Sequence, residues 1–517
     1  MLTQFTPDAW THALPADAAH AVVVGAGLGG LAAAMRLGAR GYRVTVLDRL
    51  DGPGGRGSAI VEDGHRFDLG PTIVTVPEVF RTLWQACGRD FDADVDLRPL
   101  EPYYRILWPD GSHFDASGDP EAMLREVRRL SPGDVVGYRR FLKDAEARYR
   151  FGFETLGRRP MHRIGDLIRV LPTFARFRAD RSIHAHAALR VRDPRLRMAL
   201  SFHPLFIGGD PFRVTSIYAL VSHLETAFGV HYAIGGVEAI ARAMVRIVEA
   251  QGGTVRQGAE VDEIRLANGR ATGVRLTDGA EIKADIVVSN ADAGHTYDHL
   301  LRNAPRKRWT RSKLARARWS MSLFVWYFGT TGTRDLWPDA GHHTILNGPR
   351  YQGLVEDIFR HGRLAEDMSL YVHRPSVTDP GVAPEGGDTF YALSPVPHLG
   401  YADPVDWAQM AEPYRRKVQA VLEERLLPGL SRHISASKVF TPETFRDRYL
   451  SPHGAGFSLE PRILQSAFFR PHNVSEEARG LYLVGAGTHP GAGLPGVISS
   501  AEVLDHLVPD PQTVRQT

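Results

Sequence analysis

The chain has 517 residues, of which 43% are hydrophobic and 23% are charged, and its formal net charge is +3. This composition supports a large core in more than one domain and excludes wholesale disorder. The single cysteine, Cys87, excludes an internal disulfide and a cysteine-cluster metal site, and it favours a cytoplasmic location. A net charge this small gives no argument for nucleic acid as a partner.

The beginning of the chain does not have the pattern of a secretory signal. Residues 1–20 contain neither Lys nor Arg and no long apolar run, so we predict that they form a leader rather than a signal peptide. No segment offers the about 20 consecutive apolar residues that a membrane span requires. We therefore expect that the chain does not cross a bilayer.

A strand, a tight turn, a helix and a second strand follow the leader. The apolar run 21–24 predicts a strand, 31–40 a helix and 43–48 a second strand. This order is typical of the start of a doubly wound α/β sheet. Further along, Asn-Gly and Asp-Gly turns separate short alternating segments, which predict a small antiparallel meander. These segments are a run that begins at Val255, then 261–266, 273–276 and 281–286.

Two later strands also lead into functional patterns. Residues 286–289 predict a buried strand that ends at Asn290. Residues 480–484 predict an apolar strand that leads into a second glycine-rich turn, with a helix from about Val497.

The first turn satisfies the pattern G-x-G-x-x-G between a strand and a helix. In such a motif the first glycine makes the turn, the second lets the backbone approach a pyrophosphate, and the third packs the helix on the strand. The helix N-terminus then faces the negative charge, and an acid at the end of the next strand accepts hydrogen bonds from the ribose. The residues that fit these roles are Gly25, Ala26, Gly27, Leu28, Gly29, Gly30 and Asp48.

This pattern alone leaves NAD and FAD open. Residues 52–57 form a second flexible loop that carries Arg56, whose guanidinium suits a phosphate or the flavin end of a cofactor. Residues 67–72 continue the pattern. Together these stretches resemble the flavin amine oxidase-like enzymes, in which a long first segment wraps FAD.

The carboxy-terminal pattern at 480–494 is the most specific one. Its five glycines supply backbone amides and room for close approach to a planar ring. The stretch resembles the signature of the bacterial-type phytoene desaturases, and the resemblance runs from about residue 21 to 505, closest to the enzymes of purple phototrophic bacteria. Other stretches that look like this family are 201–212, 288–292, 446–449 and 466–473. One departure is Asp48, which is more often Glu in this group.

The resemblance implies FAD as cofactor and stepwise dehydrogenation of 15-cis-phytoene to neurosporene, lycopene or both. It also implies further cofactor contacts along the chain. We expect these at Arg49, Gly55, Arg56, Gly70, Pro71, Thr72, Val261, Asn290, Asp292, Gly485, Gly487, Pro490, Gly491, Gly493 and Val497.

We therefore predict an α/β fold with a Rossmann-like FAD-binding domain, a doubly wound sheet and an antiparallel meander. This domain is discontinuous and comprises 21–150, 236–300 and 475–517. A helical membrane-associating region at 151–235 and a substrate-binding domain at 301–474 are inserted into it.

Phytoene has no polar group, so its recognition requires an apolar tunnel. The inserted regions supply suitable side chains, although ordinary core packing explains such aromatics equally well. The candidates are Phe202, Leu205, Phe206, Ile207, Phe212, Phe324, Trp326, Tyr327 and Phe328.

Dehydrogenation also releases a proton, for which a side-chain base would help. Candidates are Asp166 and Arg169, three residues apart on a predicted helix, although an ordinary i,i+3 ion pair fits them as well. His203 is a third candidate, and a hydrogen-bonded structural histidine is its alternative. We predict no metal, because the pairs His184 with His186 and His342 with His343 lack i,i+4 spacing and a nearby carboxylate.

Positive charge gathers at 158–197, where eleven arginines face three aspartates for a local charge of +8. Apolar residues interleave with these arginines at near-helical spacing, namely Ile164, Leu167, Ile168, Leu171, Phe174 and Phe177. This pattern favours a helix lying on the inner face of the cell membrane, and a solvated charged face is the alternative. No nucleic-acid-binding motif is present.

Other functions stay open. A carotenoid isomerase or ketolase would share the flavin fold, and the Rab escort proteins share it as lipid carriers without a flavin. The intact set of Asp48 and Arg56 favours an enzyme. A quinone or oxygen is the expected terminal electron acceptor, because no second dinucleotide pattern indicates NAD.

Overall fold

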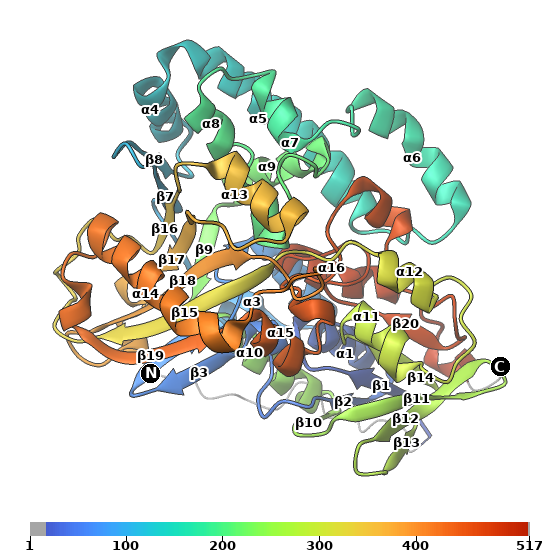
Figure 1. Cartoon of the computed structure of the whole chain (residues 1–517). Helices are drawn as coiled ribbons and strands as arrows, with labels where there is room; N and C mark the ends of the chain where they lie inside the picture. The colour runs from blue at the N-terminus through green and yellow to red at the C-terminus, as the bar shows by residue number, and fades with distance from the viewer. Residues whose placement is uncertain (1–16, 515–517) are drawn as a thin grey trace.

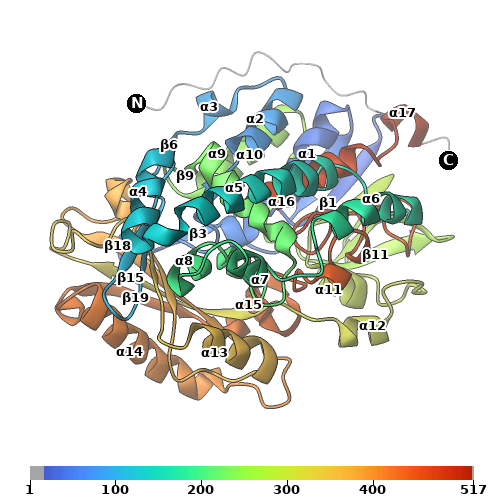
Figure 2. The same cartoon turned by 90° about the horizontal axis from the view of Figure 1, so that it is seen from above.

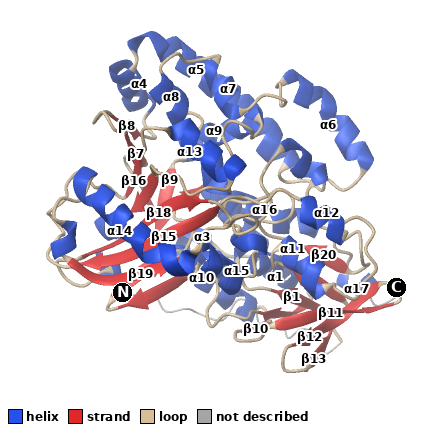
Figure 3. Ribbon diagram, viewed as in Figure 1, coloured by secondary structure: helices blue, strands red, loops and turns tan. Residues whose placement is uncertain are grey.

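A computed structural model describes residues 17–514 (Figure 1). Most of the predicted leader therefore lies outside the described residues. The strands gather in two groups, with helices above and between them in the view of Figure 3. Among residues 17–514, no helix is both long and apolar enough to span a membrane.

The first group is a five-stranded parallel sheet in the order β10-β2-β1-β14-β20. Its strands are β1 (His20–Val24), β2 (Arg43–Leu47), β10 (Thr254–Arg256), β14 (Ile286–Ser289) and β20 (Leu481–Leu483). The predicted doubly wound sheet is thereby confirmed. One detail was wrong: the strand at Val255 was expected in the meander, but as β10 it pairs with β2 along the edge of the parallel sheet.

Both faces of this sheet are covered, as parallel strands require. Val23 faces a core formed with α1 (Leu28–Ala39), α10 (Val237–Ala250) and α16 (Leu494–Asp505). Val22 and its alternate neighbours face a second core, which includes the meander. The meander consists of β11 (Val261–Ala267), β12 (Arg270–Leu276) and β13 (Glu281–Lys283).

The second group is a seven-stranded sheet in the order β19-β15-β18-β17-β16-β7-β8. Its strands are β7 (Tyr104–Leu107), β8 (His113–Ala116), β15 (Ser322–Thr330), β16 (His343–Leu346), β17 (Leu370–His373), β18 (Asp388–Val396) and β19 (Ile434–Phe440). The first two come from the segment 21–150, so this part of the chain serves the second sheet as well as the first. Helix α14 (Trp407–Arg425) packs on one face of the sheet.

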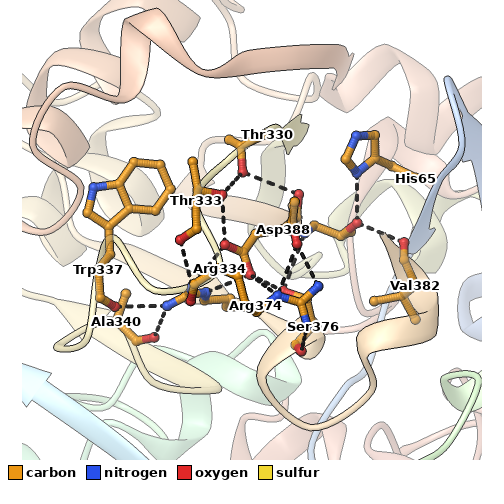
Figure 4. A network of polar contacts seen from close by, with 12 residues as sticks. His65, Thr330, Thr333, Arg334, Trp337, Ala340, Arg374, Ser376, Val382 and Asp388 are labelled. Atoms are coloured by element: carbon orange, nitrogen blue, oxygen red, sulfur yellow. Dashed lines mark hydrogen bonds and ion pairs between the residues drawn. The ribbon is translucent and has the colours of Figure 1, made fainter. Parts of the chain in front are cut away.

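A buried ion pair fixes the ends of β17 and β18 (Figure 4). The guanidinium of Arg374 donates to both carboxylate oxygens of Asp388, at 3.0 and 2.8 Å. Thr333 and Ser376 donate to the same carboxylate at 2.8 and 2.6 Å. Arg374 also donates to the carbonyl oxygen of Trp337 at 2.8 Å. This network ties the loop before β16 to the sheet.

The helices between residues 120 and 228 lie together on one side of the molecule (Figures 1 and 2). They are α4 (Pro120–Leu130), α5 (Val135–Tyr149), α6 (Ile164–Arg176), α7 (Ile183–Ala188), α8 (Pro194–Ala199) and α9 (Leu220–Phe228). Helix α6 projects at the margin of this layer.

Short elements complete the fold. The strands are β3 (Ala59–Glu62), β4 (His65–Asp68), β5 (Val74–Thr75), β6 (Leu97–Pro99) and β9 (Val230–Ala233). The helices are α2 (Pro77–Ala86), α3 (Phe91–Asp94), α11 (Ala293–His295), α12 (Arg311–Arg316), α13 (Tyr351–Glu356), α15 (Pro442–Tyr449) and α17 (Pro511–Val514).

Candidate active site

The turn between β1 and α1 needs its glycines for three different reasons. Gly25 has φ +97°, which side chains disfavour. A Cβ on Gly29 would lie 2.9 Å from the Cα of Gly485, and one on Gly30 would lie 2.0 Å from the carbonyl oxygen of Gly25. The turn can therefore pack against both its own backbone and the second glycine cluster only with glycine at these positions.

The N-terminus of α1 opens into a cavity of about 770 Å³. Gly27 caps the helix without a side-chain hydrogen bond, and the first turn of the helix contains no acidic residue. Free amide groups and the helix dipole therefore face the cavity, which is the environment that a pyrophosphate prefers.

Asp48 lies at the end of β2, beside this turn. Its carboxylate accepts hydrogen bonds from the amides of Ala26 and Leu50, at 2.6 and 2.8 Å. Burial raises the pKa of Asp48, and the two amide bonds oppose that rise. The side chain lines the cavity next to Arg49, which pairs with Glu260 on the approach to the meander at 3.3 Å. This is the place that the ribose end of a dinucleotide would take.

Most of the predicted cofactor residues line this one cavity. They include Gly25, Gly27, Leu28, Gly29, Asp48, Arg49, Gly55, Arg56, Gly70, Pro71, Thr72, Val261, Asn290, Asp292, Gly485, Pro490, Gly491, Gly493 and Val497. Ala26, Gly30 and Gly487 do not line it. Ala26 and Gly30 serve the turn itself, and a Cβ on Gly487 would lie 2.8 Å from the Cβ of Ala293. Their predicted contact with the cofactor stays a prediction.

Several buried polar atoms beside Arg56 have no hydrogen-bond partner in the described chain. They are Oδ2 of Asp292, Nε of Arg56 and the hydroxyl of Tyr449. Burial raises the pKa of Asp292, and Arg56, 3.9 Å away, lowers it. Unpaired buried groups are costly in a folded protein. This donor and acceptor set fits the polar edges of a flavin, so the residues present suit FAD.

Sequence reasoning missed several residues of this site. Arg448, Tyr449 and His295 line the cavity, although no spacing rule connects them to the glycine turns. Arg470 lies behind Gly491 and donates to the carbonyl oxygen of Ala486 at 2.7 Å. The stretches 446–449 and 466–473 resembled the family, and that resemblance was the only available signal.

Beyond the glycine turns the cavity becomes apolar and runs over one face of the seven-stranded sheet. Phe202, Leu205, Phe206, Ile207 and Tyr327 line it, as expected. Tyr327, Tyr391 and Tyr371 are anchored to the segment 69–72: their hydroxyls bond Leu69, Gly70 and Thr72 at 3.3, 3.3 and 2.8 Å.

Four other candidates do not line the cavity, and for these the expectation was wrong. Phe324, Trp326 and Phe328 belong to the core under α14. Alternate residues of a strand face opposite sides, so they turn away when Tyr327 turns toward the cavity. Phe212 instead packs against His184, with ring centres 4.5 Å apart and the ring planes tilted by 46°.

The two residues predicted as catalytic lie outside the cavity wall. Asp166 accepts a hydrogen bond from the amide of Arg163 at 3.0 Å and so caps α6. Arg169 is exposed, and no ion pair joins it to Asp166 in the described chain. Their neighbours Leu167 and Leu171 line the cavity. A catalytic role for Asp166 and Arg169 stays a prediction that their positions do not support.

The histidine pair His342 and His343 gains a third member, His373, from the neighbouring strand β17. The ring nitrogens of the three lie within 4.8 Å of one another. His342 and His373 share a contact of 3.1 Å, and His342 also bonds Thr378 at 2.7 Å. Burial lowers the pKa of His343 to about 3, so this ring is neutral. The prediction that the chain binds no metal stays a prediction.

Comparison with known proteins agrees with this geometry. Residues 28–502 match the family described as flavin containing amine oxidoreductase, and the chain belongs to this family. The predictions of an enzyme, of the Rossmann-like fold and of FAD as cofactor are thereby confirmed.

Within this family, the chain is similar over nearly its full length to phytoene desaturases. The chain is 69% identical over 500 residues to a neurosporene-forming phytoene desaturase of Cereibacter sphaeroides, covering 97% of this chain and 96% of the relative. It is 45% identical to a lycopene-forming phytoene desaturase of Paracoccus sp., covering 94% and 97%. A solved variant of putrescine oxidase has a TM-score of 0.62 at 15% identity, covering 96% and 98%, and shares the fold.

Proposed function

We propose that this chain is an FAD-dependent phytoene desaturase that acts at a membrane surface and forms neurosporene, lycopene or both. The observation that supports this most strongly is one continuous cavity that joins the dinucleotide turn at Gly25 to an apolar chamber floored by Tyr327, Tyr371 and Tyr391. Each step removes a hydride and a proton from adjacent carbons and leaves a double bond. When bound, FAD would supply the hydride acceptor, the proton would pass to water or to a side-chain base, and a quinone or oxygen would take the two electrons onward.

The residues of the chain divide this work. The α1 turn and Asp48 would hold the pyrophosphate and ribose of FAD, and Arg56 with Asp292 would meet its flavin end. The aromatic floor holds the hydrocarbon against the ring and excludes water. Specificity for so apolar a substrate comes from shape, because no hydrogen bond can register it.

Purified protein supplied with FAD and phytoene-loaded liposomes tests this function. We expect a yellow protein and new visible absorption bands, because each added double bond lengthens the conjugated system. A change only in cis-trans composition would point to an isomerase. A protein that takes up no FAD in a fluorescence titration would point to a lipid escort instead.

Helix α6 and the loop 463–469 are the proposed membrane contact, on the inner face of the cell membrane. Ile164, Ile168 and Leu464 expose 62%, 60% and 70% of their surface. Leu464 also lines the cavity, together with Leu171. An opening of the cavity beside this patch would admit a hydrocarbon dissolved in the bilayer.

Charge around this patch suits anionic lipid. Arg163, Arg169 and Arg176 lie on or next to α6, and in the described part of the chain none of them forms an ion pair. Each such residue near an anionic surface contributes about 1 kcal/mol to binding.

We expect the double variant I168D/L464D to bind vesicles of phosphatidylglycerol at least about tenfold more weakly than wild type. Two apolar side chains that would enter the interface become charged, and burying each one contributes roughly 1.5–3 kcal/mol. Vesicle flotation measures the effect. The control is V61D, because Val61 is 65% exposed on β3 and lies outside the patch. Equal binding of all three proteins would exclude α6 and this loop as the contact.

A further inference from the structure

A buried polar cluster interrupts the apolar lining of the cavity. Tyr104 donates a hydrogen bond to Glu225 at 2.9 Å, and Nε2 of His203 lies 3.1 Å from the same carboxylate oxygen. Tyr104 and His203 are 3.3 Å apart. His203 and Glu225, which line the cavity, are only 3% and 6% exposed. Burial, together with Glu225, raises the pKa of Tyr104, so its hydroxyl stays a donor.

The cluster lies at the β7 end of the sheet, two strand intervals from Tyr371 on β17, which bonds Thr72, and four intervals from Tyr327 on β15. Tyr327 on β15 bonds Leu69, next to Gly70, whereas Tyr104 belongs to β7. The strand order places β18, β17 and β16 between these two strands. Adjacent strands are about 4.8 Å apart, so the four intervals amount to roughly 19 Å.

The intervening strands supply a continuous apolar floor. Leu393, Tyr371 and Ile345 line the cavity in this order across β18, β17 and β16. Beyond Ile345, strand β16 pairs with β7 through the contact of Ile345 with Ile106. The floor therefore leads from the cofactor residues toward the Tyr104–His203–Glu225 cluster, of which His203 and Glu225 form part of the cavity wall.

A hydrocarbon cannot pass this cluster at low cost. A hydrocarbon forms no hydrogen bond. If it entered between these three side chains, it would leave buried polar groups without partners. Such a loss costs about 1–3 kcal/mol for each group, and more for a charged one. In the described chain, Nδ1 of His203 already lacks a hydrogen-bond partner. It therefore cannot compensate for a hydrogen bond lost at Nε2.

We propose that the Tyr104–His203–Glu225 cluster is the stop against which the end of the carotene chain rests, and that it thereby limits the number of dehydrogenations. This inference rests on the proposed phytoene desaturase function. The distance between the flavin end and the stop determines which carbon–carbon bond of a linear chain can lie against the ring. If the stop lies further from the flavin end, carbon–carbon bonds further from the inserted end of the carotene can lie against the ring. If the stop lies nearer, fewer carbon–carbon bonds can do so. The cluster takes no part in the chemistry.

The test compares products of the full-length enzyme with FAD and phytoene liposomes, separated by chromatography. We expect E225A/H203A to raise the ratio of lycopene to neurosporene at least about fivefold, because removing both side chains deepens the cavity. The Tyr104 hydroxyl loses its acceptor Glu225 in this variant, so a thermal melt checks that the variant is folded. The matched control is D144A/H186A. It removes another histidine–carboxylate contact, of 3.2 Å, outside the cavity wall, in which His186 is buried and Asp144 is partly exposed and also pairs with Arg190. This variant should keep the wild-type ratio.

A second variant acts in the opposite direction. I345F fills the floor just before the cluster, so we expect products with fewer double bonds than those of wild type. If wild type forms no coloured carotene, the proposed function fails. If wild type is active but I345F, or a folded E225A/H203A, leaves the ratio within twofold of wild type, the stop is refuted.

Discussion

The variant G27V should lose at least about 100-fold in FAD affinity, which corresponds to about 2.7 kcal/mol. Gly27 has φ −69°, which valine tolerates, so the backbone is not strained by the change. A Cβ there would lie 2.8 Å from Nδ2 of Asn290, the end of a side chain that can move. The branched side chain would instead fill the space that the pyrophosphate needs at the N-terminus of α1.

Flavin fluorescence titration of the flavin-free protein measures this loss. The matched control is G52V, in the loop that follows Asp48. Gly52 has no positive φ, and a Cβ there would meet no atom within 4 Å. We expect it to bind FAD like wild type. Thermal melts without FAD should agree for all three proteins, and wild-type affinity in a folded G27V would contradict the assigned pyrophosphate site.

Features set by local sequence were predictable. The β1 turn, its helix and the strand ending at Asp48 follow from adjacent residues, because hydrophobic period and glycine position determine them directly. The predicted helix 31–40 begins three residues late, since α1 already starts at Leu28. Helix starts without a side-chain cap carry little sequence signal.

Features set by long-range pairing were not predictable. The cavity floor depends on which face each strand of the second sheet presents, and the apolar run 322–328 is equally apolar on both faces. Tyr327 faces the cavity and Trp326 does not because β15 pairs with β18 and α14 packs on the opposite face of the sheet. For the same reason Glu225, on a helix between unrelated strands, gave no sign of its contact with His203 and Tyr104.

The Asp166 and Arg169 hypothesis shows a further limit. The two residues are three apart and lie on one helix, α6, as expected. However, apolar residues of α6 line the cavity, and Asp166 and Arg169 do not. Asp166 then meets the free amide of Arg163 at the start of the helix. An acid in the first turn stabilises the helix terminus, which is a simpler role for the same residue.

The variant D388A should lower the free energy of unfolding by about 3–5 kcal/mol, because it leaves the guanidinium of Arg374 buried without its counter-charge. Both side chains are almost completely buried, and Arg374 makes a two-pronged contact with the carboxylate (Figure 4). Urea unfolding measures the change. D339A is the control, because Asp339 pairs with Arg105 at 3.2 Å but is 85% exposed, and such pairs contribute at most about 1 kcal/mol.

The same pair predicts a pH dependence. Burial alone would raise the pKa of Asp388, but hydrogen bonds from Arg374, Ser376 and Thr333 outweigh it and hold the pKa below its usual value. A carboxyl whose pKa is depressed by folding stabilises the fold above its unfolded pKa, about 3.9, and loses that contribution as pH falls through the folded value. We therefore expect wild type to lose more stability than D388A between pH 5 and pH 3, so that their unfolding curves converge in acid. Parallel loss of stability in the two proteins over this range would mean that the Asp388 carboxylate does not stabilise the sheet.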